Sequence, residues 1–145
     1  MEINILSVQN RYINVKETFQ DKLQRLCDML KITPCYIPSI ISSTLNMMDE
    51  YILKHYKSSE QDSKNCSLRI NIIALACLWI ATKFHDDLPL YAKDIEYITH
   101  INWKLIVKEE IKVLYAIKYR ICKFMLEEHN PLREPATHNL THVFK

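Results

Sequence analysis

Glycine is entirely absent from this chain of 145 residues, although it makes up about 7% of an average protein. Walker loops, dinucleotide-binding fingerprints and nucleophile elbows all need glycines, because the backbone must approach a ligand closely or turn sharply there. Two-residue β-hairpins also depend on positive φ angles, which glycine adopts most easily. The composition therefore excludes most nucleotide-binding and hydrolase sites and disfavours a hairpin-rich protein.

Excess charge, long apolar runs and paired cysteines are missing as well. The formal net charge of +2 is too small to predict nucleic acid or a membrane as the partner. No apolar run reaches the roughly 18 residues of a membrane span, and the start of the chain lacks a signal-peptide pattern. The five cysteines form no C-x-x-C pair, so we expect reduced thiols. The expectation is one compact intracellular domain.

Five segments carry apolar residues at the spacing of an α-helix. Thr18 is the expected N-cap of the first segment, Pro38 suits the first turn of the second, and Ser67 is the expected N-cap of the third. The fourth and fifth cover about residues 92–99 and 103–117. No strand pattern competes, so the prediction is an all-α fold of five helices.

The third of these helices is apolar on every face over residues 72–81, which a soluble protein uses only for a buried central element. It then ends in Lys83 and Phe84, followed by Asp86 and Asp87. A core helix that brings a fixed lysine and an aromatic ring to the surface indicates a protein partner.

These motifs, in this order, resemble the cyclin box. The family's third helix typically ends in Ala-Ser-Lys-Phe/Tyr-Glu-Glu, and residues 81–86 read A-T-K-F-H-D. The family's fifth helix carries a glutamate nine residues before an aromatic-x-aliphatic ending, as Glu110 precedes residues 119–121 here. The resemblance covers residues 18–121 and implies a five-helix bundle around a buried third helix. Residues 1–17 are then an N-terminal lead-in with helical potential, and 122–145 a C-terminal extension that is partly helical and then loose.

Two further positions match the box and one departs from it. Asp49 matches the aspartate of helix two, and Ile72 matches an early leucine of helix three. The first-helix arginine, which pairs with that aspartate in many cyclins, aligns with Gln20. The same region forms the substrate-docking patch of cell-cycle cyclins, and here it reads F-Q-D-K-L over residues 19–23. The resemblance therefore does not extend to substrate docking.

The ending of the third helix narrows the subfamily. Residues 83–87, K-F-H-D-D, and the Thr33-Pro34 opening before helix two are similar to the single-box P-type, U-type and Y-type cyclins. Only 24 residues follow Ile121, whereas a second box needs about another hundred, so we expect a single box.

The resemblance implies a non-catalytic regulatory subunit that forms a heterodimer with a cyclin-dependent protein kinase and activates it, without a cofactor or metal. In the family, the lysine and the glutamate bond to kinase backbone beside the mobile C-helix, and a pocket between helices three and five receives an apolar side chain. Carried over, Lys83 and Glu110 are the bonding pair. The implied pocket walls are Ile80, Phe84, Leu114, Tyr119 and Ile121.

A further hypothesis concerns the two acids after the third helix. In some single-box cyclins an acid near this position contacts an arginine of the kinase activation segment, where it replaces an activating phosphate. Asp86 and Asp87 are the candidates. The alternative is a solvated helix end, just as Lys83 and Glu110 can be a simple surface ion pair and the apolar positions simple core residues.

Functions of other classes are weighed against kinase binding. Lys112, Lys118, Arg120 and Lys123 form a modest basic cluster, through which a cyclin-fold transcription-factor-like module would bind DNA or other proteins without a kinase. Nucleic acid is the less favoured partner because the net charge is small. The histidines at 129, 138 and 142 allow a zinc site, but a polar tail is the favoured interpretation. No nucleophile–base or paired-carboxylate motif is visible, so an enzyme is not expected.

Overall fold

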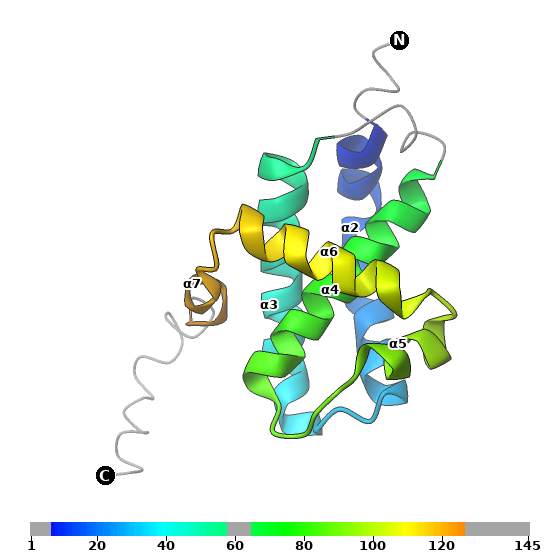
Figure 1. The fold of residues 1–145 in the computed structure, drawn as a ribbon, viewed down its shortest axis with the longest axis vertical. Coiled ribbons are helices and arrows are strands. Elements are labelled where there is room, and N and C mark those ends of the chain that lie inside the picture. The colour runs from blue at the N-terminus through cyan, green and yellow to red at the C-terminus, as the bar shows by residue number, and fades with distance from the viewer. Residues whose placement is uncertain (1–6, 58–64, 127–145) are drawn as a thin grey trace.

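The computed structural model describes residues 7–57 and 65–126, and within these ranges the chain is helical with no strand (Figure 1). The helices are α2 (Ser7–Met29), α3 (Ile37–Glu50), α4 (Cys66–His85), α5 (Ala92–Thr99), α6 (Trp103–Ala116) and α7 (Ile121–Leu126), with a 3-10 turn η1 (Pro34–Tyr36) and a π-helical turn η2 (Tyr51–His55). Helices α2 to α6 correspond to the five predicted helices. The predicted fold class is therefore confirmed.

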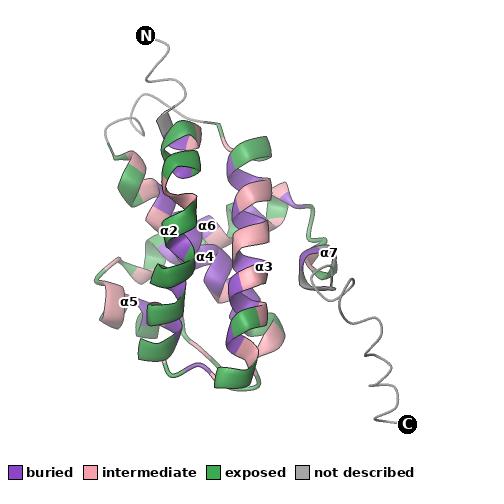
Figure 2. Ribbon diagram, turned by 180° about the vertical axis from the view of Figure 1, so that it is seen from behind, coloured by how far each residue is buried: buried purple, intermediate pink, exposed green. Residues whose placement is uncertain are grey.

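Helix α4 is the central element. It packs against α2, α3 and α6, and α6 crosses it on the face opposite α2 and α3 (Figures 1 and 2). Almost every residue between Ile70 and Thr82 is buried, as the all-round apolar pattern predicts. By length and composition alone α4 qualifies as a membrane span, contrary to the expectation from sequence. However, 61% of its apolar window is buried inside the bundle, as in the core helix of a soluble protein.

The predicted start of the first helix is wrong. Helix α2 begins at Ser7, and Thr18 lies well inside it, where the Thr18 hydroxyl donates a hydrogen bond to the Val15 carbonyl at 2.7 Å. Val8 and Tyr12 are fully buried, so the first turns of α2 belong to the core. The sequence does not predict this early start, because polar residues surround Val8 and Tyr12 and the apolar stripe there is sparse. The predicted cap of the third helix is also wrong, because α4 begins at Cys66, Ser67 lies inside it, and no side chain caps it.

Helix ends are closed without glycine. Lys31, His100, Lys118 and Tyr119 adopt left-handed backbone angles, with φ between 56° and 64°. This conformation costs a non-glycine residue about 1–2 kcal/mol. Capping hydrogen bonds offset the cost, since the amide of His100 donates to the Glu96 carbonyl at 2.7 Å, and those of Ile32 and Tyr119 donate to Cys27 and Leu114.

A second, smaller cluster of buried side chains lies beside the main core. It consists of Leu75, Ile95 and Ile106, which come from α4, α5 and α6. Trp79 and Leu90 pack against it from its edge. Because Trp79 lies one helical turn before Lys83, this cluster packs against the side of α4 that carries Lys83.

Candidate functional site

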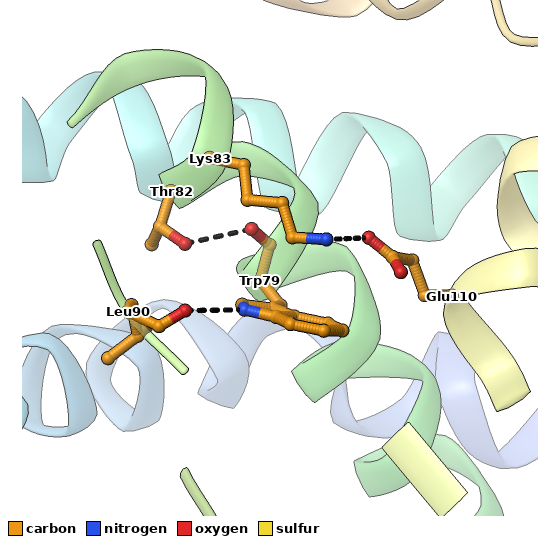
Figure 3. A network of polar contacts seen from close by, with 5 residues as sticks. All are labelled: Trp79, Thr82, Lys83, Leu90 and Glu110. Atoms are coloured by element: carbon orange, nitrogen blue, oxygen red, sulfur yellow. Dashed lines mark hydrogen bonds and ion pairs between the residues drawn. The ribbon is translucent and has the colours of Figure 1, made fainter. Parts of the chain in front are cut away.

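The structure brings Lys83 and Glu110 into direct contact. Lys83 lies in the last turn of α4 and Glu110 in the middle of α6, and the Lys83 Nζ donates to the Glu110 Oε2 at 2.5 Å (Figure 3). The Lys83 side chain is 46% exposed and that of Glu110 is 13% exposed. The two residues that the resemblance selects lie 27 positions apart in the sequence. In the structure they form one ion pair at the surface, which joins α4 to α6.

Trp79 is the residue at this site that the sequence reasoning missed. The Lys83 Nζ lies 3.6 Å from the centroid of the Trp79 ring, well within the range of a cation–π contact. The indole Nε1 donates to the Leu90 carbonyl at 2.7 Å. A signal was present, because Trp79 and Lys83 are four residues apart on a helix and share one face.

The predicted apolar positions differ in burial. Ile80 is a core residue, 3% exposed, and Leu114 is partly buried against the same core. Phe84 is 47% exposed and lies edge-on to the His85 ring. Tyr119 is exposed in the left-handed corner after α6, and Ile121, the first residue of α7, is partly buried. Contact of these residues with a partner stays a prediction.

Asp86 and Asp87 are engaged within the chain. The Thr33 hydroxyl donates to the Asp86 Oδ1 at 3.0 Å, and the Leu88 amide donates to the same oxygen at 3.2 Å. The Tyr36 hydroxyl donates to the Asp87 Oδ2 at 3.2 Å, and this hydrogen bond raises the pKa of Tyr36. The two acids therefore tie the segment before α3 to the end of α4, a role that the sequence reasoning did not assign to them.

Asp49 has partners on the first helix despite the missing arginine. It accepts hydrogen bonds from the Tyr12 hydroxyl at 2.6 Å and from the Lys16 ammonium at 3.0 Å. Lys16 lies one turn before Gln20, which is exposed. Burial, together with the hydrogen bond to Asp49, raises the pKa of Tyr12. Asp49 thus keeps a cationic partner, but this partner is Lys16 and not the residue at position 20, where the family has its arginine. Ile72, the other matched box position, is buried.

A groove of about 330 Å³ lies between α2, α4 and the end of α5, away from the Lys83–Glu110 pair. Phe19, Leu23 and Leu75 contribute apolar surface to it, and Lys22 and Arg25 also line it. None of the predicted kinase-binding residues lines this groove.

Glu109, next to Glu110, has the opposite environment. It is 1% exposed and pairs with the Arg69 guanidinium, which also donates to the Tyr56 hydroxyl at 3.1 Å. Burial and the nearby Glu109 carboxylate raise the pKa of Tyr51. Adjacent glutamates thus serve two purposes, since Glu109 ties α6 to the start of α4 inside the protein while Glu110 faces Lys83 at the surface.

Among residues 7–57 and 65–126, no group of His, Cys, Asp or Glu side chains could hold a metal ion. The histidines at 129, 138 and 142 lie outside the described residues. In the basic cluster, Lys112, Lys118 and Arg120 are exposed, and the Lys123 side chain is outside the description.

Comparison with known proteins gives one match. A family model described as the cyclin N-terminal domain matches residues 14–122. No curated protein and no solved structure matches the chain significantly. Cyclins are regulatory, non-catalytic proteins that act through protein–protein interactions, typically with kinases. Because the match covers well over half of the chain and the described helices form the five-helix bundle, this protein belongs to the cyclin family.

Proposed function

We propose that this cyclin binds and activates a cyclin-dependent protein kinase, with the kinase C-helix docked against the ends of α4 and α6. The observation that carries this proposal is the Lys83–Glu110 contact of 2.5 Å between the two helices. Activation of such a kinase requires its mobile C-helix to move inward and complete an internal Lys–Glu pair. A fixed surface that holds the C-helix in that position would shift the kinase toward its active state.

The chemistry of the pair suits backbone recognition. A lysine ammonium has three N–H donors, and Glu110 accepts from one of them. The donors that remain can reach a backbone carbonyl of the partner, because almost half of the Lys83 side chain is exposed. The Glu110 carboxylate can likewise accept from a partner amide. Such charge-assisted bonds fix orientation well.

Apolar anchors beside the pair would supply most of the affinity. Phe84 and Tyr119 are exposed, and Leu114 is partly buried against the core. We further propose that Asp87, the more exposed of the two acids, contacts an arginine of the kinase activation segment.

The complex would be a heterodimer inside the cell, where kinases find their ATP. The free state of all five cysteines is consistent with that location.

The first experiment replaces Lys83 with alanine. Affinity purification from native cells identifies the kinase, and calorimetric titration with that purified kinase then measures Kd. We expect Lys83→Ala to raise Kd at least about fivefold, which corresponds to about 1 kcal/mol, the threshold of an interface hot spot. Its thermal stability should change little, because a partly exposed ion pair contributes only about 0–1 kcal/mol.

Lys54→Ala is the matched control. Lys54 is 67% exposed and also pairs with a glutamate, but it lies in the π-helical turn η2. This variant should bind the kinase like the wild type. An unchanged Kd for folded Lys83→Ala would refute the proposed function.

A second candidate function is supported by three exposed basic residues, Lys112 on α6 and Lys118 and Arg120 in the corner after it. A cyclin-fold transcription-factor-like module would bind DNA through such a surface. An affinity for duplex DNA that falls steeply with salt would favour this function over kinase binding.

A further inference from the structure

The contact between Lys83 and Trp79 is unusually close. The Nζ lies 3.6 Å from the Trp79 ring centroid, whereas Lys22 lies 4.8 Å from the Phe19 ring and Lys93 lies 5.6 Å from the Trp103 ring. Tryptophan is also the aromatic residue that attracts cations most strongly. The Lys83 ammonium is thus held between an indole face on its own helix and the Glu110 carboxylate on α6 (Figure 3).

The indole ring is itself fixed on two sides. Its Nε1 donates to the Leu90 carbonyl at 2.7 Å, so that the segment between α4 and α5 holds the far edge of the ring. The ring also packs against the cluster of Leu75, Ile95 and Ile106. The hydrogen bond and the packing together restrain the ring in its position beside the ammonium.

Glu110 alone would not hold the lysine in this way. Lysine has a long, flexible stem, and a partly exposed ion pair gains little free energy beyond the rotamer freedom lost in forming it. A second contact from a rigid ring removes that freedom in the unbound protein. Ordering a side chain before binding lowers the entropic cost of association.

We propose that Trp79 is a positioning residue of the kinase interface, whose indole ring holds the Lys83 ammonium in its binding position before the kinase arrives. This inference rests on the proposed function. Trp79 acts through Lys83, and it need not touch the kinase itself. Its loss should therefore weaken binding only where the lysine is present.

A double-mutant cycle tests this prediction. Kd for the purified kinase is measured for the wild type, Trp79→Leu, Lys83→Ala and the double variant, at a temperature where circular dichroism shows each to be folded. We expect Trp79→Leu to weaken binding about three- to tenfold in the wild type and less than twofold in the Lys83→Ala background. Trp79→Phe keeps an aromatic face and should recover part of the loss.

Trp103→Leu is the matched control, because Trp103 lies about two helical turns before Glu110 and contacts other lysines. It should leave Kd unchanged. An equal loss on Trp79→Leu in both backgrounds, or no loss in either, would overturn the role of Trp79.

A measurement on the free protein separates this inference from the proposed function. Because the Lys83 Nζ lies 3.6 Å from the Trp79 ring centroid, we expect the NMR signals of the adjacent Hε protons to be shifted upfield. Trp79→Leu should abolish this shift. Absence of the shift in the wild type overturns the inference whatever the kinase does. No kinase binding by the wild type overturns the proposed function and the kinase role of Trp79 together, whereas wild-type binding with an additive cycle overturns only the role of Trp79.

Discussion

Replacing Arg69 with methionine removes one partner of the buried ion pair with Glu109 but keeps an apolar side chain of similar reach. The Glu109 side chain is only 2% exposed and that of Arg69 is 20% exposed, so the pair is shielded from water. Removing one partner of such a pair leaves an uncompensated buried charge, which costs about 3–5 kcal/mol. This is a large part of the 5–15 kcal/mol by which a domain is typically stable.

Urea unfolding followed by far-ultraviolet circular dichroism measures this loss of stability. Every described element is a helix, so the helical signal disappears as the protein unfolds. The midpoint of thermal unfolding should fall by roughly 10 °C. Two controls bracket the effect. The double variant Arg69→Met, Glu109→Leu leaves no buried charge and should recover most of the stability.

The second control is Lys16→Met, which breaks the pair with Asp49. Those side chains are 37% and 42% exposed, so the cost should be no more than about 1 kcal/mol. A loss below about 1 kcal/mol for Arg69→Met, or a double variant no more stable than the single one, would contradict the role assigned to this pair.

Two other predictions concern Asp87 and the Cys27 thiol. Asp87→Asn should bind the kinase with nearly unchanged affinity but activate its unphosphorylated form less, because the charge offered to the activation segment is lost. Kinase assays with a substrate peptide measure this, and full activation would exclude the contact. Burial raises the pKa of Cys27 from 9.0 to about 12, so the unfolded chain releases this proton first and stability should fall as pH rises from about 9 toward 12. Urea unfolding at a series of pH values measures the fall, Cys27→Ala should reduce it, and a flat profile would contradict the assignment.

The fold could be predicted wherever the apolar pattern of the sequence is compatible with only one arrangement of the helix. A helix that is apolar on every face over residues 72–81 has to be buried, and the structure buries it at the centre of the bundle. The fourth and fifth predicted helices agree with α5 and α6 to within about a residue. The same all-round apolar pattern does not show how the helix is rotated, however, so it cannot indicate which of its residues face α6 and which face α2 and α3.

Tertiary pairing accounts for what the sequence did not reveal. Arg69 and Glu109 are 40 positions apart, and nothing in the local pattern distinguishes Glu109 from the exposed glutamates of other helices. Lys16 lies in the first turns of α2, which look polar, so the sequence pattern does not predict its contact with Asp49. In each case the partner comes from another helix, and local propensity carries no information about it.

The left-handed residues Lys118 and Tyr119 make the corner between α6 and α7 a stiff joint. Side chains with a Cβ atom sample fewer backbone states than glycine, so the unfolded chain loses less entropy when this corner forms, and the folded corner has few other shapes to adopt. Hydrogen bonds from Lys118 to Tyr115 and from Arg120 to Ile117 brace it further. A partner that reached Tyr119 would therefore meet a preformed edge instead of a loop that has to be ordered first.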